Sequence, residues 1–399
     1  MNVTITPGLL RGAITPPPSK SQAHRLLIAA ALADGESRIE HLADSQDIQA
    51  TRRCMAALKA PGEDLPVLDC GESGSTLRFL IPVALALRGG GRFTGRGRLM
   101  ERPQKPYFDL FDEKGIAYRQ EDGVLTVQGR LTPGTFALPG DVSSQFVTGL
   151  LYALPLLEGD SRITLTTPLE SRGYVDMTLE ALERFGIRAE CPDGRTLRVP
   201  GGQTYRPCRA AVESDYSQAA FYYAANGLGG QVEILGLNPR SAQGDRCIVP
   251  YHMQLCSPGE AELDVSQCPD LVPPLAAHAA LRQGITRIVN AARLRIKESD
   301  RLTAVTHVLT ALGADVVEGA DRLTITGQPE GLAGGVTVDS HNDHRIAMML
   351  AVAATRAEGT VTIRGAESVA KSYPDFWEVY ESLGGRVLRQ REEREACDM

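Results

Sequence analysis

Residues 284–288 (GITRI) lead through residues 296–301 (IKESDR) into an amphipathic stretch that ends at Leu312 and Gly313. This sequence pattern, called a phrase below, consists of a glycine, a strand-like apolar run, a polar loop and a helix-like stretch that ends near another glycine. Good copies of it begin at Gly35, Gly159 and Gly359, and weaker copies begin at Gly91 and Gly230. A phrase that recurs along the whole chain predicts a protein built from repeated α+β units.

A second phrase follows several of the copies. It is a short run of alternating apolar residues, found at residues 124–129, 196–201 and 323–327. This alternation predicts strands buried on one face. Between the phrases lie Ala- and Leu-rich segments, predicted to be buried helices, at residues 25–33, 146–157, 217–226 and 345–355. A period of roughly 55 to 75 residues exceeds that of a solenoid, so six α+β units are expected, with plain α/β alternation as the alternative.

The length of 399 residues predicts two or three domains, and the fold class is α/β. A boundary in the middle of the chain gives an N-terminal domain of three units at residues 13–212. The C-terminal domain then comprises residues 213–399 and residues 1–12, because the first strand, at residues 2–9, precedes the first full repeat. The two chain crossings, near residues 12–18 and 210–215, predict a hinge.

The composition excludes several classes of protein. The chain has 42 Lys and Arg against 49 Asp and Glu, a net charge of −7, which argues against a general nucleic-acid binder. The start of the chain lacks a secretory signal pattern, and the most apolar segment, residues 79–87, is too short to cross a bilayer. The eight cysteines form no Cys-x-x-Cys pair. We therefore expect a cytoplasmic protein with reduced thiols, no membrane contact and no bound metal.

Several predicted helices begin with cations, although a helix N-terminus disfavours positive charge. These starts are residues 18–25, 71–78, 297–301 and 342–345. Each one alone is compatible with a capped helix that carries a solvated cation. Their recurrence fits bound anions, because a helix N-terminus and a cation favour the same phosphate or carboxylate. Arg102 and Lys371 lie in comparable polar loops, so the pattern predicts small, multiply anionic ligands rather than a polymer.

Seven motifs occur in one order along the chain, at residues 18–21, 71–78, 102–103, 143–145, 297–301, 342–345 and 371–375. Together they resemble the 5-enolpyruvylshikimate-3-phosphate synthase family of enolpyruvyl transferases. The resemblance implies a two-domain inside-out α/β barrel of six βαβαββ units, three in each domain, which closes like a clamp on its substrates. It also implies transfer of the carboxyvinyl group of phosphoenolpyruvate to the 5-hydroxyl of shikimate 3-phosphate, with release of phosphate and without a cofactor.

The resemblance further implies a place in the shikimate pathway to chorismate and aromatic amino acids, and a target of glyphosate. The residues implied to bind shikimate 3-phosphate are Lys20, Ser21, Arg25, Ser143, Ser144, Gln145, Ser171, Tyr174, Asp270 and Lys297. Those implied to bind phosphoenolpyruvate are Lys20, Gly74, Arg102, Gln145, Arg301, Arg345 and Lys371. The implied catalytic residues are Asp270 as the base towards the 5-hydroxyl, Glu298 for proton transfer at C3, and Lys20 as a further acid or base.

Two alternatives stand beside this interpretation. The first is the related transferase that acts on UDP-N-acetylglucosamine, whose sequence pattern has Lys-Asn near the N-terminus and usually a reactive cysteine in the loop before its Arg-Pro dipeptide. Here Ser21 follows Lys20, and residues 89–102 contain no cysteine. The second alternative is a non-catalytic protein that binds phosphorylated metabolites, which would lack the proton-transferring residues. A monomer is expected.

Overall fold

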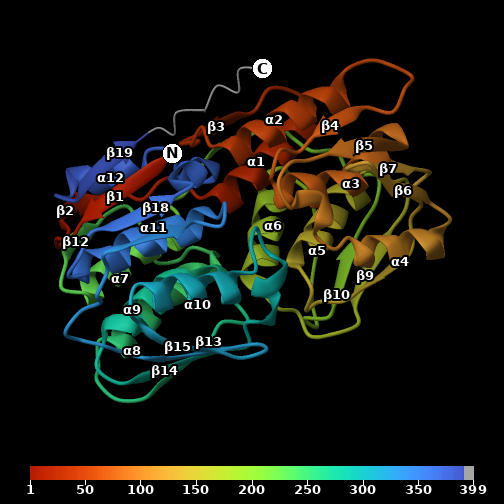
Figure 1. Ribbon diagram of the computed structural model, residues 1–399. Helices are drawn as coiled ribbons and strands as arrows, with labels where there is room; N and C mark the ends of the chain where they lie inside the picture. Colours follow the sequence, from red (N-terminus) through yellow and green to blue (C-terminus); the bar gives the residue numbers. More distant parts are fainter. Residues whose placement is uncertain (391–399) are drawn as a thin grey trace. The chain divides into compact units, whose positions relative to one another are not determined.

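The structure is a computed structural model that describes residues 1–390 (Figure 1). The chain forms two compact units. The N-terminal unit comprises Pro18–Ser214 and Asn238–Gly244, and the C-terminal unit comprises Met1–Pro17, Asp215–Leu237 and the chain from Asp245 on. These divisions lie within a few residues of the expected crossings. In addition, a short segment, residues 238–244, belongs to the N-terminal unit although the chain before and after it belongs to the C-terminal unit. The sequence did not predict this excursion of the chain.

The N-terminal unit alternates strands and helices (Figure 1). Its helices are α1 (Lys20–Leu32), α2 (Gln46–Lys59), α3 (Gly74–Arg88), α4 (Lys105–Lys114), α5 (Ser144–Ala153) and α6 (Arg172–Arg184). Its strands are β3 (Arg38–Glu40), β4 (Val67–Asp69), β5 (Gly90–Thr94), β6 (Ala117–Glu121), β7 (Val124–Gln128), β8 (Thr135–Leu138), β9 (Ser161–Leu165), β10 (Thr196–Val199) and β11 (Arg209–Ala211).

The C-terminal unit has the same alternation. Its helices are α7 (Tyr216–Gly227), α8 (Ile248–Leu255), α9 (Val272–Leu281), α10 (Arg301–Ala311), α11 (His344–Ala353) and α12 (Phe376–Ser382). Its strands are β1 (Asn2–Thr6), β2 (Arg11–Ile14), β12 (Gln231–Ile234), β13 (Ala261–Asp264), β14 (Ile285–Val289), β15 (Asp315–Glu318), β16 (Leu323–Thr326), β17 (Val336–Asp339), β18 (Val361–Arg364) and β19 (Arg386–Gln390).

Three four-stranded sheets have the same topology. In the orders β4-β5-β7-β6 and β13-β14-β16-β15, the first two strands are parallel and the other neighbours are antiparallel. The sheet β17-β18-β1-β19 repeats this arrangement with the N-terminal strand in third place, where Val3 pairs with Ile363 and Arg389. The first strand of the chain therefore completes the last repeat.

The other three sheets are reduced forms of the same unit. Strands β8 and β9 are parallel and β10 is antiparallel to β9, while an isolated bridge of Glu190 to Arg198 marks the place of a fourth strand. The pairs β11-β3 and β12-β2 retain only two parallel strands. Within residues 1–390 each unit thus contains three sheets, in agreement with a repeat that occurs six times.

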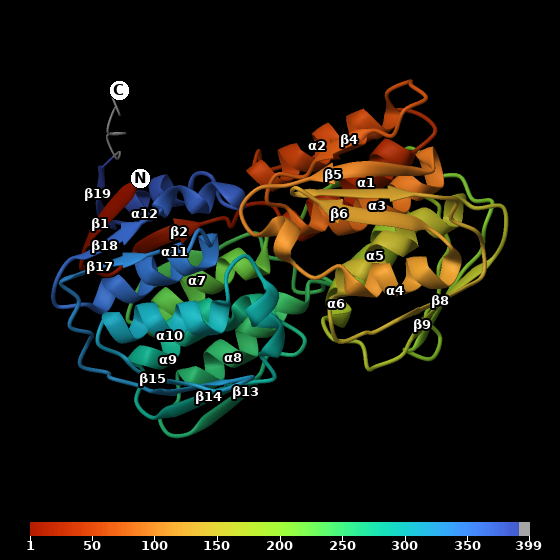
Figure 2. The same cartoon turned by 45° about the vertical axis from the view of Figure 1, so that its right-hand side comes forward.

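In both units the central helices are enclosed by the sheets. All ten residues of α9 and all ten of α11 are buried, and α3 and α5 are buried over most of their length. In Figure 2, α9, α10 and α11 lie between the strands β13–β15 and the strands β17–β19. A helix that is apolar all round has to be buried, so the composition of these segments accounts for helices inside and sheets outside. The predicted α/β class is confirmed.

The elements differ from their predicted bounds at chemically defined points. The first long helix, predicted to open within residues 18–25, begins at Lys20, because the hydroxyl of Ser19 accepts a hydrogen bond from the N–H of Gln22 and caps the helix. The predicted strand at residues 2–9 ends at Thr6, because Pro7 has no N–H to donate to a neighbouring strand. The alternating runs are strands β7, β10 and β16, each buried on one face.

One of the glycines that open the repeats is required by a close backbone approach. Gly284 has a φ of +124°, and a Cβ there would lie 2.0 Å from the carbonyl oxygen of Gly259. Any other residue at position 284 would separate the start of β14 from the loop before β13.

The seven cysteines within the described residues are free thiols, and Cys397 lies outside that range. Over the same part of the chain no helix combines the length and the apolar character needed to span a bilayer.

Because β1 lies between β18 and β19 in its sheet, its buried side chains should contribute to the stability of the C-terminal unit. Ile5 is fully buried, so Ile5→Ala leaves a cavity, and we expect it to lower the free energy of unfolding by about 2–5 kcal/mol. Urea unfolding followed by the fluorescence of Trp377, the single tryptophan of the chain, reports on this unit. The control is Val317→Ala in β15, where the side chain is 62% exposed and the change should stay within about 0.5 kcal/mol. Equal effects of the two substitutions would contradict the burial of β1.

Candidate active site

The first helix of the N-terminal unit begins with a lysine that is held by a carboxylate. The Nζ atom of Lys20 lies 2.9 Å from Oδ2 of Asp47, near the start of α2. Their side chains are only 17% and 11% exposed, so water screens the pair incompletely. The ion pair offsets the unfavourable position of a cation at a helix N-terminus.

Arg25, one turn further along α1, is a buried cation. Its guanidinium donates to the carbonyl oxygens of Ser21 and Tyr174, at 2.6 and 2.7 Å, and to the hydroxyl of Thr178 at 2.9 Å. Among the described residues no carboxylate pairs with it, and burial lowers the pKa of Arg25 to about 10. A buried charge without a countercharge is costly, so this position favours an anionic ligand.

Helix α3 begins at a glycine that lies against an arginine. A Cβ at Gly74 would lie 2.6 Å from Nη1 of Arg102, so the absence of a side chain leaves room for the guanidinium. Arg102 is 8% exposed, and its Nε has no hydrogen-bond partner within residues 1–390. The buried Arg102 therefore has donor capacity that the described chain does not use.

Gln145, in the first turn of α5, is held from two sides. Its Oε1 accepts a hydrogen bond from Arg78 at 2.8 Å, and its Nε2 donates to the hydroxyl of Ser75 at 3.0 Å. Ser143 caps the same helix by accepting from the N–H of Gln145, and Ser144 is buried beside it. Arg78 thus orients Gln145, a role the sequence prediction did not include.

Ser171 precedes α6 in a left-handed backbone conformation, with a φ of +55°. Such a conformation is uncommon for a residue with a side chain and often marks a functional position. Ser171 is buried, and Tyr174 follows in the first turn with its carbonyl oxygen bound to Arg25. A Cβ at Gly173 would lie 2.7 Å from the nitrogen of Gly244, so the short excursion of the chain packs closely against this helix start.

In the C-terminal unit, Arg301 is the centre of an ionic cluster. The guanidinium lies 2.8 Å from Asp343, 2.7 Å from Glu298 and 2.8 Å from Asp270, and its side chain is 1% exposed. Burial disfavours its charged form, but the three carboxylates outweigh burial and raise the pKa of Arg301 above its ordinary value. The arginine therefore remains charged and fixes all three carboxylates around it.

Asp270 is shared by three cations. Its carboxylate lies 3.3 Å from the Nζ of Lys297, 2.8 Å from Arg301 and 3.3 Å from Arg345. Arg345 also donates to the hydroxyl of Ser217 at 2.9 Å. Burial lowers the pKa of Lys297, and the charge of Asp270 acts in the opposite direction. An acid at the start of a helix can be a simple cap, but here Asp270 joins three cations, of which Arg301 and Arg345 are buried.

Lys371 lies beside a turn in which two successive residues are left-handed. His341 and Asn342 have φ angles of +53° and +51°. The turn directs the carbonyl oxygen of Asn342 to the Nζ of Lys371 at 2.5 Å. Lys371 is 4% exposed, so its ammonium group is held in a defined position.

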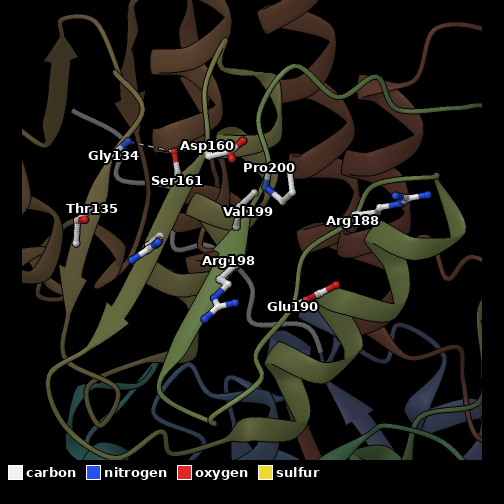
Figure 3. A pocket seen from close by; sticks show the side chains of 10 residues that line it. Gly134, Thr135, Asp160, Ser161, Arg188, Glu190, Arg198, Val199 and Pro200 are labelled. Atoms are coloured by element: carbon white, nitrogen blue, oxygen red, sulfur yellow. Dashed lines mark hydrogen bonds between the residues drawn. The ribbon is translucent and has the colours of Figure 1, made fainter.

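A pocket of about 540 Å³ lies on the sheet of β8, β9 and β10 (Figure 3). Its lining residues are Gly134, Thr135, Asp160, Ser161, Arg162, Arg188, Glu190, Arg198, Val199 and Pro200. None of the predicted site residues is among them. This pocket is therefore distinct from the helix starts described above.

The structure brings many of the predicted residues together within each unit. In the C-terminal unit, one cluster contains Asp270, Lys297, Glu298, Arg301 and Arg345. In the N-terminal unit, contacts join Ser21, Arg25 and Tyr174, and Gly74 lies beside Arg102. The binding and catalytic roles of these residues stay predictions.

Three residues that contact predicted site residues were not themselves predicted from the sequence, namely Asp47, Arg78 and Asp343. Arg78 and Asp343 do lie inside two of the quoted motifs, residues 71–78 and 342–345. The sequence did contain a signal for Arg78 and Asp343, because each is a charged residue at the start of an apolar helix. A charged side chain in that position needs a partner once the helix is buried.

Helices enclosed by three sheets in each unit, with buried cations at the helix starts, define an α/β protein whose helix starts suit the binding of small anionic molecules. The chain belongs to the EPSP synthase (3-phosphoshikimate 1-carboxyvinyltransferase) family, which matches residues 5–380.

Individual relatives agree with the family. A 3-phosphoshikimate 1-carboxyvinyltransferase of Clostridium perfringens (strain 13 / Type A) is 45% identical over 423 residues, covering 97% of this chain and 99% of the relative. One of Clostridium acetobutylicum is 46% identical over 420 residues, covering 96% and 98%. The solved structure of EPSP synthase from Acinetobacter baumannii has a TM-score of 0.78 at 26% identity, and covers 97% of this chain and all of that one.

Membership of this family confirms the resemblance found in the motifs, and with it the predicted class of enzyme, a transferase of the shikimate pathway. Enolpyruvyl transfer is the reaction of the family, and its substrates are small molecules. The alternative transferase acting on UDP-N-acetylglucosamine is not favoured.

Asp343 provides a test of the ionic cluster. Asp343→Ala removes a fully buried carboxylate from Arg301 and also the cap that accepts the N–H of Arg345. We expect the free energy of unfolding to fall by about 3 kcal/mol or more, because a buried charge loses a partner. The measurement is again urea unfolding followed by Trp377. In the control, Asp321→Ala breaks an exposed pair with Arg322 and should cost less than about 1 kcal/mol. A similar cost for both would show that the buried cluster does not depend on Asp343.

Proposed function

We propose that this chain transfers the enolpyruvyl group of phosphoenolpyruvate to the 5-hydroxyl of shikimate 3-phosphate, and that the predicted residues of both units carry the reaction. The observation that carries the proposal is the contrast between two buried arginines. Arg25 has only neutral partners among the described residues, whereas Arg301 is surrounded by carboxylates. The first suits the binding of an anion, and the second suits the placement of groups that transfer protons.

For shikimate 3-phosphate, the proposed contacts begin with its carboxylate. Arg25 and Ser21 bind that carboxylate, which supplies the countercharge that Arg25 lacks. The hydroxyls of Ser143, Ser144 and Ser171 bind the 3-phosphate, with Tyr174 nearby. Support comes from the positions of these serines at the starts of α5 and α6, where the partial positive charge of a helix N-terminus favours phosphate. Lys297 and Gln145 orient the same substrate.

For phosphoenolpyruvate, the proposed ligands are Lys20, Gly74, Arg102, Gln145, Arg301, Arg345 and Lys371. Five of these residues are cations, and phosphoenolpyruvate carries a phosphate and a carboxylate. Arginine suits both groups because its donors form paired contacts with two oxygens. Two anionic substrates repel each other, and fixed cations remove that barrier while they hold the reacting atoms in place.

The proposed chemistry is addition followed by elimination. The 5-hydroxyl oxygen attacks C2 of phosphoenolpyruvate and loses its proton to Asp270, while C3 gains a proton from Glu298. In the second step Glu298 takes a proton back from C3, the double bond forms again and phosphate leaves from C2. Lys20 serves as a further acid or base. Support comes from Arg301, which holds the carboxylates of Asp270 and Glu298 on its two terminal nitrogens.

The remaining proposals concern the setting of the reaction. The chain acts in the cytoplasm as a monomer, without nucleic acid and without a cofactor. The two units move about the hinge at the chain crossings, so that water leaves when the substrates bind. The reaction feeds the pathway to chorismate and aromatic amino acids.

The first experiment measures phosphate release from phosphoenolpyruvate by the metal-free protein, with and without shikimate 3-phosphate. Release should require both substrates. Glu298→Gln keeps the size of the side chain but removes its proton transfer, so kcat should fall by about 100-fold or more. The matched control is Glu262→Gln in the exposed part of β13, which should leave kcat unchanged. Release without shikimate 3-phosphate, or an active Glu298→Gln variant, would contradict the proposal. Binding of phosphoenolpyruvate without turnover would favour the non-catalytic alternative.

Gly74→Ala tests the proposed phosphoenolpyruvate contacts. The added Cβ would displace the guanidinium of Arg102, so we expect KM for phosphoenolpyruvate to rise by about tenfold, equivalent to about 1.4 kcal/mol. KM for shikimate 3-phosphate should change much less. Steady-state kinetics with each substrate varied in turn give both values. Gly8→Ala is the control, because its nearest atom, Nη2 of Arg386, lies 3.5 Å away. Equal changes in both KM values would argue against a specific role of Gly74 and Arg102.

A further inference from the structure

Three side chains outside the predicted active site converge in the C-terminal unit. His252 lies in α8, Cys256 follows the end of that helix, and His278 lies in α9. The ligand atoms of all three lie within 4.8 Å of one another, and the Sγ of Cys256 is 3.6 Å from Nε2 of His252. A spacing of four residues places His252 and Cys256 on one face of α8.

The buried member of this cluster is His278, and one nitrogen of its ring has no hydrogen-bond partner among the described residues. His278 is 1% exposed, and within residues 1–390 its Nε2 has no partner. A Cβ at Gly227 would lie 2.2 Å from Nε2, so the ring packs directly against α7 and its position is fixed. An unsatisfied buried polar group calls for an explanation, and a bound ion is one.

The two imidazoles also approach each other. Their ring centroids are 5.4 Å apart with an angle of 41° between the planes. Helices α8 and α9 lie side by side, so the cluster spans two packed elements (Figure 2). Cys256 is exposed and His252 is half-buried, so the thiol side of the cluster is open to solvent.

We propose that His252, Cys256 and His278 form a binding site for a divalent transition-metal ion of the zinc class, with solvent as the fourth ligand. Two imidazoles and a thiolate are ligands that zinc and cobalt prefer over magnesium or calcium. In tetrahedral zinc sites the ligand atoms are about 3.3–3.8 Å apart, as follows from bonds of about 2.0–2.3 Å. The cluster, whose ligand atoms lie within 4.8 Å of one another, therefore needs a closure of up to about 1.5 Å, which the exposed Cys256 and the half-buried His252 can supply.

The site has no part in the proposed enolpyruvyl transfer, since none of its residues belongs to either substrate cluster. A bound ion would connect α8 to α9 and stabilise the folded unit by mass action. The experiment uses the full chain without a histidine tag, kept reduced and freed of metal, and titrated with Co²⁺. We expect one equivalent to bind, with the visible bands of tetrahedral cobalt and a thiolate-to-cobalt charge-transfer band. Zn²⁺ should displace the cobalt and raise the Tm.

The variants locate the ion. Cys256→Ser should abolish the charge-transfer band and weaken Co²⁺ binding by tenfold or more, and His252→Gln should remove the tetrahedral bands. Both residues are partly exposed, so these variants should fold, with kcat unchanged in metal-free protein. The matched control, Cys191→Ser in the N-terminal unit, should retain both signatures. Absence of Co²⁺ binding, or an unchanged spectrum in Cys256→Ser, would overturn the proposal.

Discussion

Parallel pairing of two strands within one repeat is the constraint that positions most of the predicted site. When two strands run in the same direction, their carboxyl ends meet at one edge of the sheet, and the residues that follow them become neighbours. Gly74 follows β4 and Arg102 follows the parallel strand β5, and the two are in contact. Asp270 follows β13 and Arg301 follows β14, and they form an ion pair. The same relation links the turn after β17 to Lys371 after β18.

The buried helices explain why charge gathers at these edges. Helices α9 and α11 are buried along their whole length, so a charge in their interior would be costly, and polar groups are confined to the helix ends. The N-terminal ends carry unsatisfied N–H groups and a partial positive charge. Where a cation also occupies such an end, it needs an anion. Asp343 supplies one from the chain beside Arg301, and a substrate is the other available source.

The repeat and its strands could be predicted from the sequence because their signals are local: a glycine that permits a close approach, alternation in a strand, and a cap before a helix. The site residues came from motifs whose order is specific to a family. The role of Asp343, the excursion at residues 238–244 and the convergence of His252 with His278 could not be predicted, because each depends on packing between distant segments.

The two buried arginines show how one fold can support two electrostatic tasks. Around Arg301 the charges of three cations and three carboxylates balance, so the cluster is satisfied by the chain itself. Arg25 has no such balance among the described residues, so its burial is costly until an anion arrives. The free energy of neutralising Arg25 is then available for binding the substrate, and the cluster around Arg301 keeps its geometry because its own charges are already paired.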